Sequence, residues 1–406
     1  MTLRDAIFAG DGAAVSRALQ DPDVRARIDE PLPGGAFGQT ALLAAVSCAN
    51  RDVIDTLLRA GADINQKSHW WAGGFHALDD AWNEPWLASF LIGRGAVPEI
   101  HHAVRLGMTD EVQRMLDGDS SRIRARGGDG QLPLHFAQSI EMADFLLSHG
   151  ADVNARDVDH ESTAAQWMIR DRQEISRELV SRGSEVDILM AAALGDAARV
   201  TSLLNEDPNR IYARVSESWF PKRDPRAGGT IYIWALGAYK TAHAVAREFE
   251  RAAVLDVLAP RTPDILRLIV ACEEGDLAVA RELRNRHPDL IASLPPSERR
   301  AIADTAERNN TAGVGLMLEA GWPVNATGKH GATALHWAAF HGNLEMVQQL
   351  LRYDAPVYAT EIDFNGTPLN WAEHGSIHGW HRATGDYSGT IAALKAAAAA
   401  REGGHS

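Results

Sequence analysis

GATALHWAAFHGNLEMVQQLLRYDAPVY, residues 331–358, is the stretch that decides the fold. It reads as a turn, an alanine-rich helix, a glycine-containing turn and a second helix that ends in a leucine pair. The same ending recurs in LLRAGADIN (57–65), FLIGRGAVPE (90–99), FLLSHGADVN (145–154), LVSRGSEVD (179–187) and MLEAGWPVN (317–325). Its glycines lie 34 residues apart from Gly61 to Gly95 and 33 apart from Gly150 to Gly183. This fixed period predicts a chain of stacked helix pairs.

The opening phrase recurs in register as GQTALLAA at Gly38, GQLPLHFA at Gly130 and GTPLNWA at Gly366. Together the motifs resemble the ankyrin repeat: a β-turn, Thr-Pro-Leu-His-x-Ala, a first helix, a turn, a second helix ending in Leu-Leu, then Gly-Ala-Asp-Val-Asn. Degenerate copies such as RDAIFAGDGAAVSRAL fill the gaps. The resemblance therefore predicts an all-α ankyrin-repeat solenoid of about twelve helix-turn-helix repeats, with β-turn fingers and two long loop insertions.

The resemblance also implies function. Ankyrin proteins mostly bind other macromolecules, through the tips of the fingers and the first helices that line the concave face. The motifs are also similar to those of a group of bacterial whole-chain ankyrin proteins, which share the PKR-PRAGGT insertion and the GWH-TGDY ending. No activity follows from that second resemblance.

Composition restricts the class of protein. The chain has 406 residues, of which 45% are hydrophobic and 23% charged, as in soluble folded proteins, and no apolar run approaches the ~20 residues of a membrane helix. The net charge of −14 argues against nucleic acid as a partner. The N-terminus lacks the pattern of a signal peptide, and the two cysteines are far apart, so we expect a cytoplasmic protein without disulfides and without membrane partners.

The repeats form one continuous solenoid in this interpretation, and we expect it to be a monomer. Its predicted parts are N-terminal repeats over 1–214, a loop insertion over the concave face at 215–232, C-terminal repeats over 233–398 and a flexible tail at 399–406.

Two fingers carry unusual side chains. The lengthened finger QKSHWWAGGFHAL (66–78) has His69, Trp70 and Trp71 at its tip, where tryptophans either bind a ligand or cover a neighbouring finger. The finger within ARDVDHESTAAQW (155–167) crowds carboxylates, including Glu161, around His160. Such groups either hold a metal or exchange protons, or simply form the turn hydrogen bonds common in acidic fingers.

The insertion SESWFPKRDPRAGGTIYIW (216–234) mixes cations with aromatic residues. Its Trp219, Phe220, Lys222 and Arg226 are predicted to bind an anionic group, with the alternative that salt bridges pin the loop to the acidic surface. Lys240 and His243, in the following helix, are expected to face the same space.

The last repeat, GTPLNWAEHGSIHGWHRATGDY (366–387), is longer than its neighbour. Because Gly375 and Gly379 disfavour a helix, we expect the first helix to end at His374 and to be followed by an extended loop that includes Trp380. Asp386 is expected either to cap the next helix or to take part in a site. The candidate catalytic or metal-binding groups of this region are His341, His374, His381, Asp386 and Tyr387. By contrast, His135 and His336 occupy the Leu-His position and are expected to be structural.

Three functions fit these patterns. The leading hypothesis is a binding protein that holds a peptide or a small polar, anionic ligand in its concave groove. The second is an unusual enzyme, an isomerase, lyase or hydrolase, that uses groove histidines with Asp386 and Tyr387 as acid–base groups or metal ligands. The third is a protein–protein scaffold. The cofactor is either a divalent metal or none, and the sequence does not choose between these.

Overall fold

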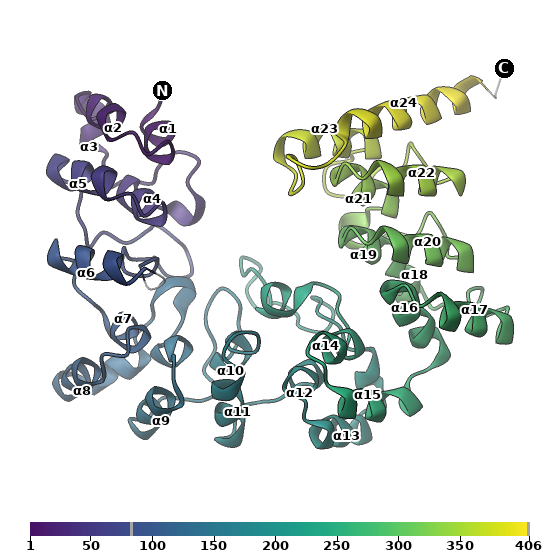
Figure 1. Ribbon diagram of the computed structural model, residues 1–406, viewed down its shortest axis with the longest axis horizontal. Helices are drawn as coiled ribbons and strands as arrows, with labels where there is room; N and C mark the ends of the chain where they lie inside the picture. Colours follow the sequence, from purple (N-terminus) through teal and green to yellow (C-terminus); the bar gives the residue numbers. More distant parts are fainter. Residues whose placement is uncertain (82–83, 404–406) are drawn as a thin grey trace. The chain divides into compact units, whose positions relative to one another are not determined.

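The computed structural model describes residues 1–81 and 84–403 and divides into two compact units, unit 1 (Met1–Arg251) and unit 2 (Ala252–Ser406). In each unit, short helices follow one another in pairs along the chain (Figure 1). Among the described residues, extended backbone pairs only at isolated antiparallel bridges such as Pro31–Thr40 and Arg156–Thr163. None of the described helices combines the length and apolar character needed to cross a bilayer.

The helices of unit 1 are α1 (Leu3–Phe8), α2 (Gly12–Ala18), α3 (Pro22–Ala26), α4 (Ala41–Ser47), α5 (Arg51–Ala60), α6 (Pro85–Gly93), α7 (Ile100–Arg105), α8 (Thr109–Gly118), α9 (Ile140–Ser148), α10 (Ala164–Trp167), α11 (Gln173–Ser181), α12 (Ile188–Leu194), α13 (Ala197–Glu206) and α14 (Ala242–Glu248). Those of unit 2 are α15 (Ala252–Leu258), α16 (Asp264–Glu274), α17 (Leu277–Arg286), α18 (Pro296–Arg299), α19 (Ala301–Glu307), α20 (Thr311–Ala320), α21 (Ala334–Phe340), α22 (Leu344–Arg352), α23 (Pro368–His378) and α24 (Tyr387–Gly403). Residues 399–403 of the predicted flexible tail belong to α24, and the rest of that tail, 404–406, lies outside the described residues.

Local sequence explains where these helices begin and end. The hydroxyl of Thr40 accepts a hydrogen bond from Leu43 N at 3.3 Å and so caps α4, and Thr241 caps α14 in the same way. At the other end, α5 finishes at Gly61 with φ 105° and α20 at Gly321 with φ 92°. Glycine adopts this left-handed conformation without steric cost, so the recurring glycine of the repeat has a structural purpose.

The first helices of successive repeats pack on one another, as α1 does on α4, α12 on α14, and α21 on α19 and α23. Small residues such as Ala44 and Ala192 are fully buried at these contacts and allow the helices to approach closely. The second helices add an apolar stripe, for example Ile54 of α5 and Leu350 of α22. Each helix pair therefore buries its apolar face against its neighbours, and stability is distributed along the stack.

Candidate functional site

The 66–78 finger carries an aromatic tip. The finger closes on itself through hydrogen bonds from Ser68 N to Phe75 O (2.8 Å) and from Phe75 N to Ser68 Oγ (2.9 Å). Phe37, from the preceding finger, packs edge-on against Trp70, with ring centroids 5.0 Å apart, and lies 5.6 Å from Phe75. Trp71 follows at 6.2 Å from Trp70. These rings shield one another only in part, because Phe37 remains 51% exposed.

The same finger is long because it reaches the finger at residues 127–131. Trp70 Nε1 donates to Asp129 Oδ1 at 3.0 Å, and Asp129 N donates to Gly73 O at 3.2 Å. A side chain at Gly73 would place its Cβ 2.4 Å from Gly127 O, so this close approach requires glycine. The exposed His69 contributes a backbone hydrogen bond to Gly38 O at 3.0 Å. Trp70 therefore covers a neighbouring finger, one of the two roles predicted for it.

Asp129 connects this contact to the next finger, residues 157–162. Its carbonyl oxygen accepts hydrogen bonds from Val158 N and Asp159 N, both at 3.0 Å. Burial raises the pKa of the Asp129 carboxyl to about 6; nearby His160 opposes the shift, whereas the charge of Asp159 adds to it. Two carboxyl groups and one imidazole therefore converge where the two fingers meet.

The insertion 216–234 folds back onto the 157–162 finger. The Glu161 carboxylate accepts the backbone N–H groups of Arg223 and Asp224 at 2.8–3.0 Å. His160 Nδ1 lies 2.9 Å from Gly229 O, and Ile231 N donates to Ser162 Oγ at 3.1 Å. Three of the four unusual segments found in the sequence thus meet at one place in unit 1.

Arg226 joins the insertion to the aromatic tip, because its guanidinium lies over the Trp71 ring at 4.3 Å. We call Phe37, Trp70, Trp71, Phe75 and Arg226 the aromatic patch. The Arg226 side chain is 65% exposed and pairs with Asp224 at 2.7 Å within its own loop.

The other predicted cations have acidic partners. Lys222 pairs with Glu217 at 3.2 Å, and Lys240 pairs with Glu248 at 2.5 Å. Burial, with a smaller contribution from Arg247, lowers the pKa of His243 to about 4. The ion pairs of Lys222 and Arg226 lie within the insertion itself, so they do not pin it to the rest of the surface; the Glu161 carboxylate does so through backbone N–H groups.

Trp219 and Phe220 line a cavity of about 340 Å³ beneath the insertion. Phe220 packs edge-on against the buried Tyr232, with ring centroids 5.3 Å apart, and the Tyr232 hydroxyl donates to Asp187 at 2.8 Å. Arg156 and Arg210 also line this cavity.

In unit 2 the final repeat forms a second aromatic cluster. Trp380 is 66% exposed; its ring stacks on Trp337 at 6.4 Å and lies 5.3 Å from Phe340. His341 lies 5.1 Å from His381 between ring centroids, so two of the predicted histidines do meet. Burial lowers the pKa of His341 to about 4.

The remaining candidates of this repeat have structural partners. Asp386 Oδ1 accepts Gly389 N at 2.8 Å and caps α24, and the buried Tyr387 donates its hydroxyl to Phe340 O at 2.9 Å. His374 and His378 lie one turn apart on α23, exposed, with ring centroids 4.7 Å apart. The expectation that the first helix ends at His374 is wrong, because α23 continues to His378.

Gly375 lies inside α23 because no side chain fits there. Its Cβ would sit 2.4 Å from Phe340 O and 3.0 Å from the Tyr387 ring. We expect Gly375→Ala to destabilise unit 2, although alanine improves helix propensity by about 1 kcal/mol. The matched variant Gly315→Ala in α20 meets only the flexible end of Gln349, at 3.3 Å, and should leave stability unchanged or raise it. Urea midpoints measure both effects, and a Gly375→Ala chain as stable as Gly315→Ala would contradict this account.

Two comparisons agree with this geometry. The family model "Ankyrin repeats (3 copies)" matches residues 268–361 and 302–377, and "Ankyrin repeat" matches 37–69 and 129–158. The chain carries ankyrin repeats. The predicted all-α ankyrin-repeat solenoid is confirmed, whereas membership of the narrower bacterial group stays a prediction.

Curated relatives match only short parts of this chain. The chain is 32% identical over 117 residues to a probable E3 ubiquitin-protein ligase XBOS32 of Oryza sativa subsp. japonica, which covers 29% of this chain and 23% of that protein. It is 32% identical over 94 residues to palmitoyltransferase Hip14 of Drosophila melanogaster (21% and 15%) and 38% identical over 56 residues to human palmitoyltransferase ZDHHC17 (14% and 9%). The chain thus spans less than a quarter of the length of these relatives. Ankyrin repeats generally mediate protein–protein binding, so the family match supports a scaffold role. It does not indicate a particular catalytic activity.

Sequence reasoning missed a buried cluster at the start of α7. His102 Nε2 lies 3.2 Å from Asp79 Oδ1, and His101 Nε2 lies 3.3 Å from Glu99 Oε2. Burial lowers the pKa values of His76 and His101 to about 4, with His102 adding to both shifts. The adjacent histidines of IHHAVRL were the available signal, but nothing local to them indicates Asp79 as a partner.

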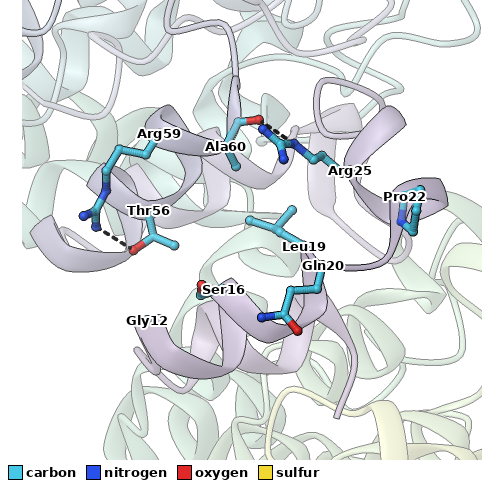
Figure 2. A pocket seen from close by; sticks show the side chains of 9 residues that line it. All are labelled: Gly12, Ser16, Leu19, Gln20, Pro22, Arg25, Thr56, Arg59 and Ala60. Atoms are coloured by element: carbon cyan, nitrogen blue, oxygen red, sulfur yellow. Dashed lines mark hydrogen bonds between the residues drawn. The ribbon is translucent and has the colours of Figure 1, made fainter.

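A cavity of about 770 Å³ between α2 and α5 contains none of the predicted site residues (Figure 2). Its two arginines are already engaged, since Arg25 Nε donates to Ala60 O at 3.2 Å and Arg59 donates to Thr56 Oγ1 at 3.3 Å. Among the described residues, those that line it carry no carboxylate, imidazole or thiol.

Proposed function

We propose that the protein binds a peptide segment of a partner protein through the aromatic patch of unit 1. The observation that carries the proposal is the row formed by Arg226, Trp71, Trp70 and Phe37, whose aromatic rings are partly exposed although tryptophan and phenylalanine are costly to leave in water. Tryptophan and arginine are also the residues that most often dominate binding energy at protein interfaces.

The charges beside the patch suggest the chemistry of the peptide. Arg223 is exposed on the insertion, and its backbone is fixed by the Glu161 carboxylate. Arg226 is the second cation, and its partner Asp224 occupies only part of its exposed guanidinium. We therefore infer a peptide that presents an apolar or aromatic side chain to Trp71 and a carboxylate to Arg223 and Arg226.

Trp71→Ala combined with Arg226→Ala is expected to weaken strongly the binding of peptides selected by display against the whole chain. Trp70 is left unchanged because its bond to Asp129 also holds two fingers together. Loss of a tryptophan–arginine anchor costs about 2–4 kcal/mol, a decrease in affinity of roughly 30-fold or more. Calorimetric titration measures the affinity, and circular dichroism checks the fold.

The matched control is Trp86→Ala. Trp86 on α6 is also partly exposed and also lies under an arginine, Arg51, at 5.1 Å, but it is outside the aromatic patch. Equal loss of affinity in this control, or full affinity in the Trp71/Arg226 double variant, would show that the patch is not the binding surface.

A second candidate is a small polar ligand in the cavity beneath the insertion. Its volume of about 340 Å³ lies within the range of ligand sites, and charged side chains of both signs line it beside the aromatic walls: Arg156, Arg210, Glu185 and Asp187. Phe220→Ala would weaken such a ligand and leave binding to the aromatic patch intact, which separates the two proposals.

A further inference from the structure

His160 is held in one tautomer by the insertion. Its Nδ1 lies 2.9 Å from Gly229 O, and a carbonyl oxygen can only accept, so Nδ1 carries the proton. In the neutral ring, Nε2 then presents a lone pair. That atom lies 3.6 Å from Asp159 Oδ2, beyond hydrogen-bond distance, although the two side chains are only 10% and 8% exposed.

Asp129 brings a second carboxylate to the same point. One ligand atom from each of Asp129, Asp159 and His160 lies within 4.8 Å of the other two. Each carboxylate is held by an N–H group, since Gly228 N donates to Asp159 Oδ1 at 3.1 Å and Trp70 Nε1 donates to Asp129 Oδ1 at 3.0 Å. Two carboxylates and a lone pair that face one another in a partly dry site repel, and either a proton or a cation held between them removes that repulsion.

The cluster near α7 has the same residue types and the opposite tautomer. There His102 Nδ1 accepts a hydrogen bond from Glu99 N at 2.9 Å, so in the neutral ring the proton is on Nε2. Nε2 then donates to Asp79 Oδ1 at 3.2 Å, which completes an ordinary hydrogen bond. His102 and Asp79 therefore satisfy each other without an ion, and this pair offers an internal comparison.

We propose that Asp129, Asp159 and His160 bind one divalent first-row cation of the Zn²⁺ or Mn²⁺ type. One imidazole nitrogen and two carboxylate oxygens suit such ions, and a carbonyl that accepts the other ring N–H is the usual support of a metal-bound histidine. Ligand distances of about 2.0–2.2 Å require the three groups to close by roughly an ångström or less. The ion would join the 127–131 and 157–162 fingers under the insertion. The inference rests on this geometry and not on the proposed peptide.

Calorimetric titration of the metal-stripped, untagged full chain with ZnCl₂ and then MnCl₂ tests the proposal. His374→Ala and His378→Ala are included in every protein, because these exposed histidines, one turn apart on α23, would otherwise bind Zn²⁺ themselves. We expect one tightly bound ion per chain. Asp129→Asn removes a proposed metal ligand itself. Loss of a residue that only supports a ligand typically lowers metal affinity 10- to 100-fold, so we expect the metal affinity of Asp129→Asn to fall by more than this.

Asp129→Asn is chosen because it should fold. Asp129 has φ 56°, which asparagine tolerates well, and an amide oxygen still accepts from Trp70 Nε1. Asp79→Asn in the other cluster is the control and should bind the ion as the parent does. The proposal is overturned if the parent binds neither ion, if Asp129→Asn binds as well as the parent, or if Asp79→Asn loses the ion instead.

Discussion

Asp157→Ala is expected to destabilise unit 1 by about 3 kcal/mol or more. The buried carboxylate of Asp157 accepts three hydrogen bonds: from His160 N at 2.7 Å, from Ser162 N at 2.7 Å and from Trp167 Nε1 at 3.3 Å. Alanine leaves all three donors without their acceptor, and each buried unpaired donor costs roughly 1–3 kcal/mol. Urea denaturation followed by circular dichroism measures the loss.

The effect should also reach the insertion. His160 and Glu161 lie on the turn that Asp157 closes, and both bind backbone groups of the insertion. We therefore expect faster hydrogen exchange at residues 223–231 in Asp157→Ala, as measured by mass spectrometry.

Asp152→Ala is the matched control, since Asp152 accepts one exposed hydrogen bond, from Asn154 N at 2.9 Å. It should change stability by no more than about 0.5 kcal/mol. Comparable losses in the two variants would contradict the role given to Asp157.

The fold was predictable because its signal is periodic. The spacing of Gly61 and Gly95, and of Gly150 and Gly183, is a property of the chain itself, and each of these glycines has positive φ in the structure. Unusual finger residues were also visible, since an apolar or charged cluster interrupts a regular pattern. Periodicity thus identifies both the repeats and the places that depart from them.

The partners of those residues were not predictable. Trp70 bonds Asp129, 59 positions away, and His160 bonds Gly229, 69 positions away. Each contact depends on the length and direction of a loop, which the sequence period does not specify. The prediction from helix propensity that the helix ends before Gly375 was wrong for a related reason. Glycine is required there because the carbonyl oxygen of Phe340, in the neighbouring α21, leaves no room for a side chain.

Acid is expected to destabilise the chain between pH ~6.5 and ~4, before most carboxylates titrate. Burial lowers the pKa values of four histidines, His76, His101, His243 and His341, from 6.5 to about 4. The unfolded chain takes up these protons near pH 6.5 and the folded chain does not. Their contribution to stability is therefore complete above pH 6.5 and is lost as pH falls to about 4.

The loss should be larger in unit 1, which holds three of these histidines, than in unit 2, which holds one. Each proton taken up on unfolding lowers the free energy of unfolding by roughly 1.4 kcal/mol per pH unit. Nearby Asp79 stays charged over this pH range. Burial alone would raise its pKa, but the hydrogen bond from His102 and the neighbouring imidazoles outweigh burial and lower the pKa to about 2.

His101→Phe tests this directly, because the phenyl ring keeps the contact with Phe136, now 5.3 Å between centroids, and removes one titrating group. The pH dependence of the urea midpoint should become shallower by about one proton in unit 1. His149→Gln, at an exposed position on the surface of the same unit, should keep the slope of the parent chain. An unchanged slope in His101→Phe would mean that this imidazole is protonated in the folded state, and its burial beside Glu99 would then be an ion pair rather than a neutral contact.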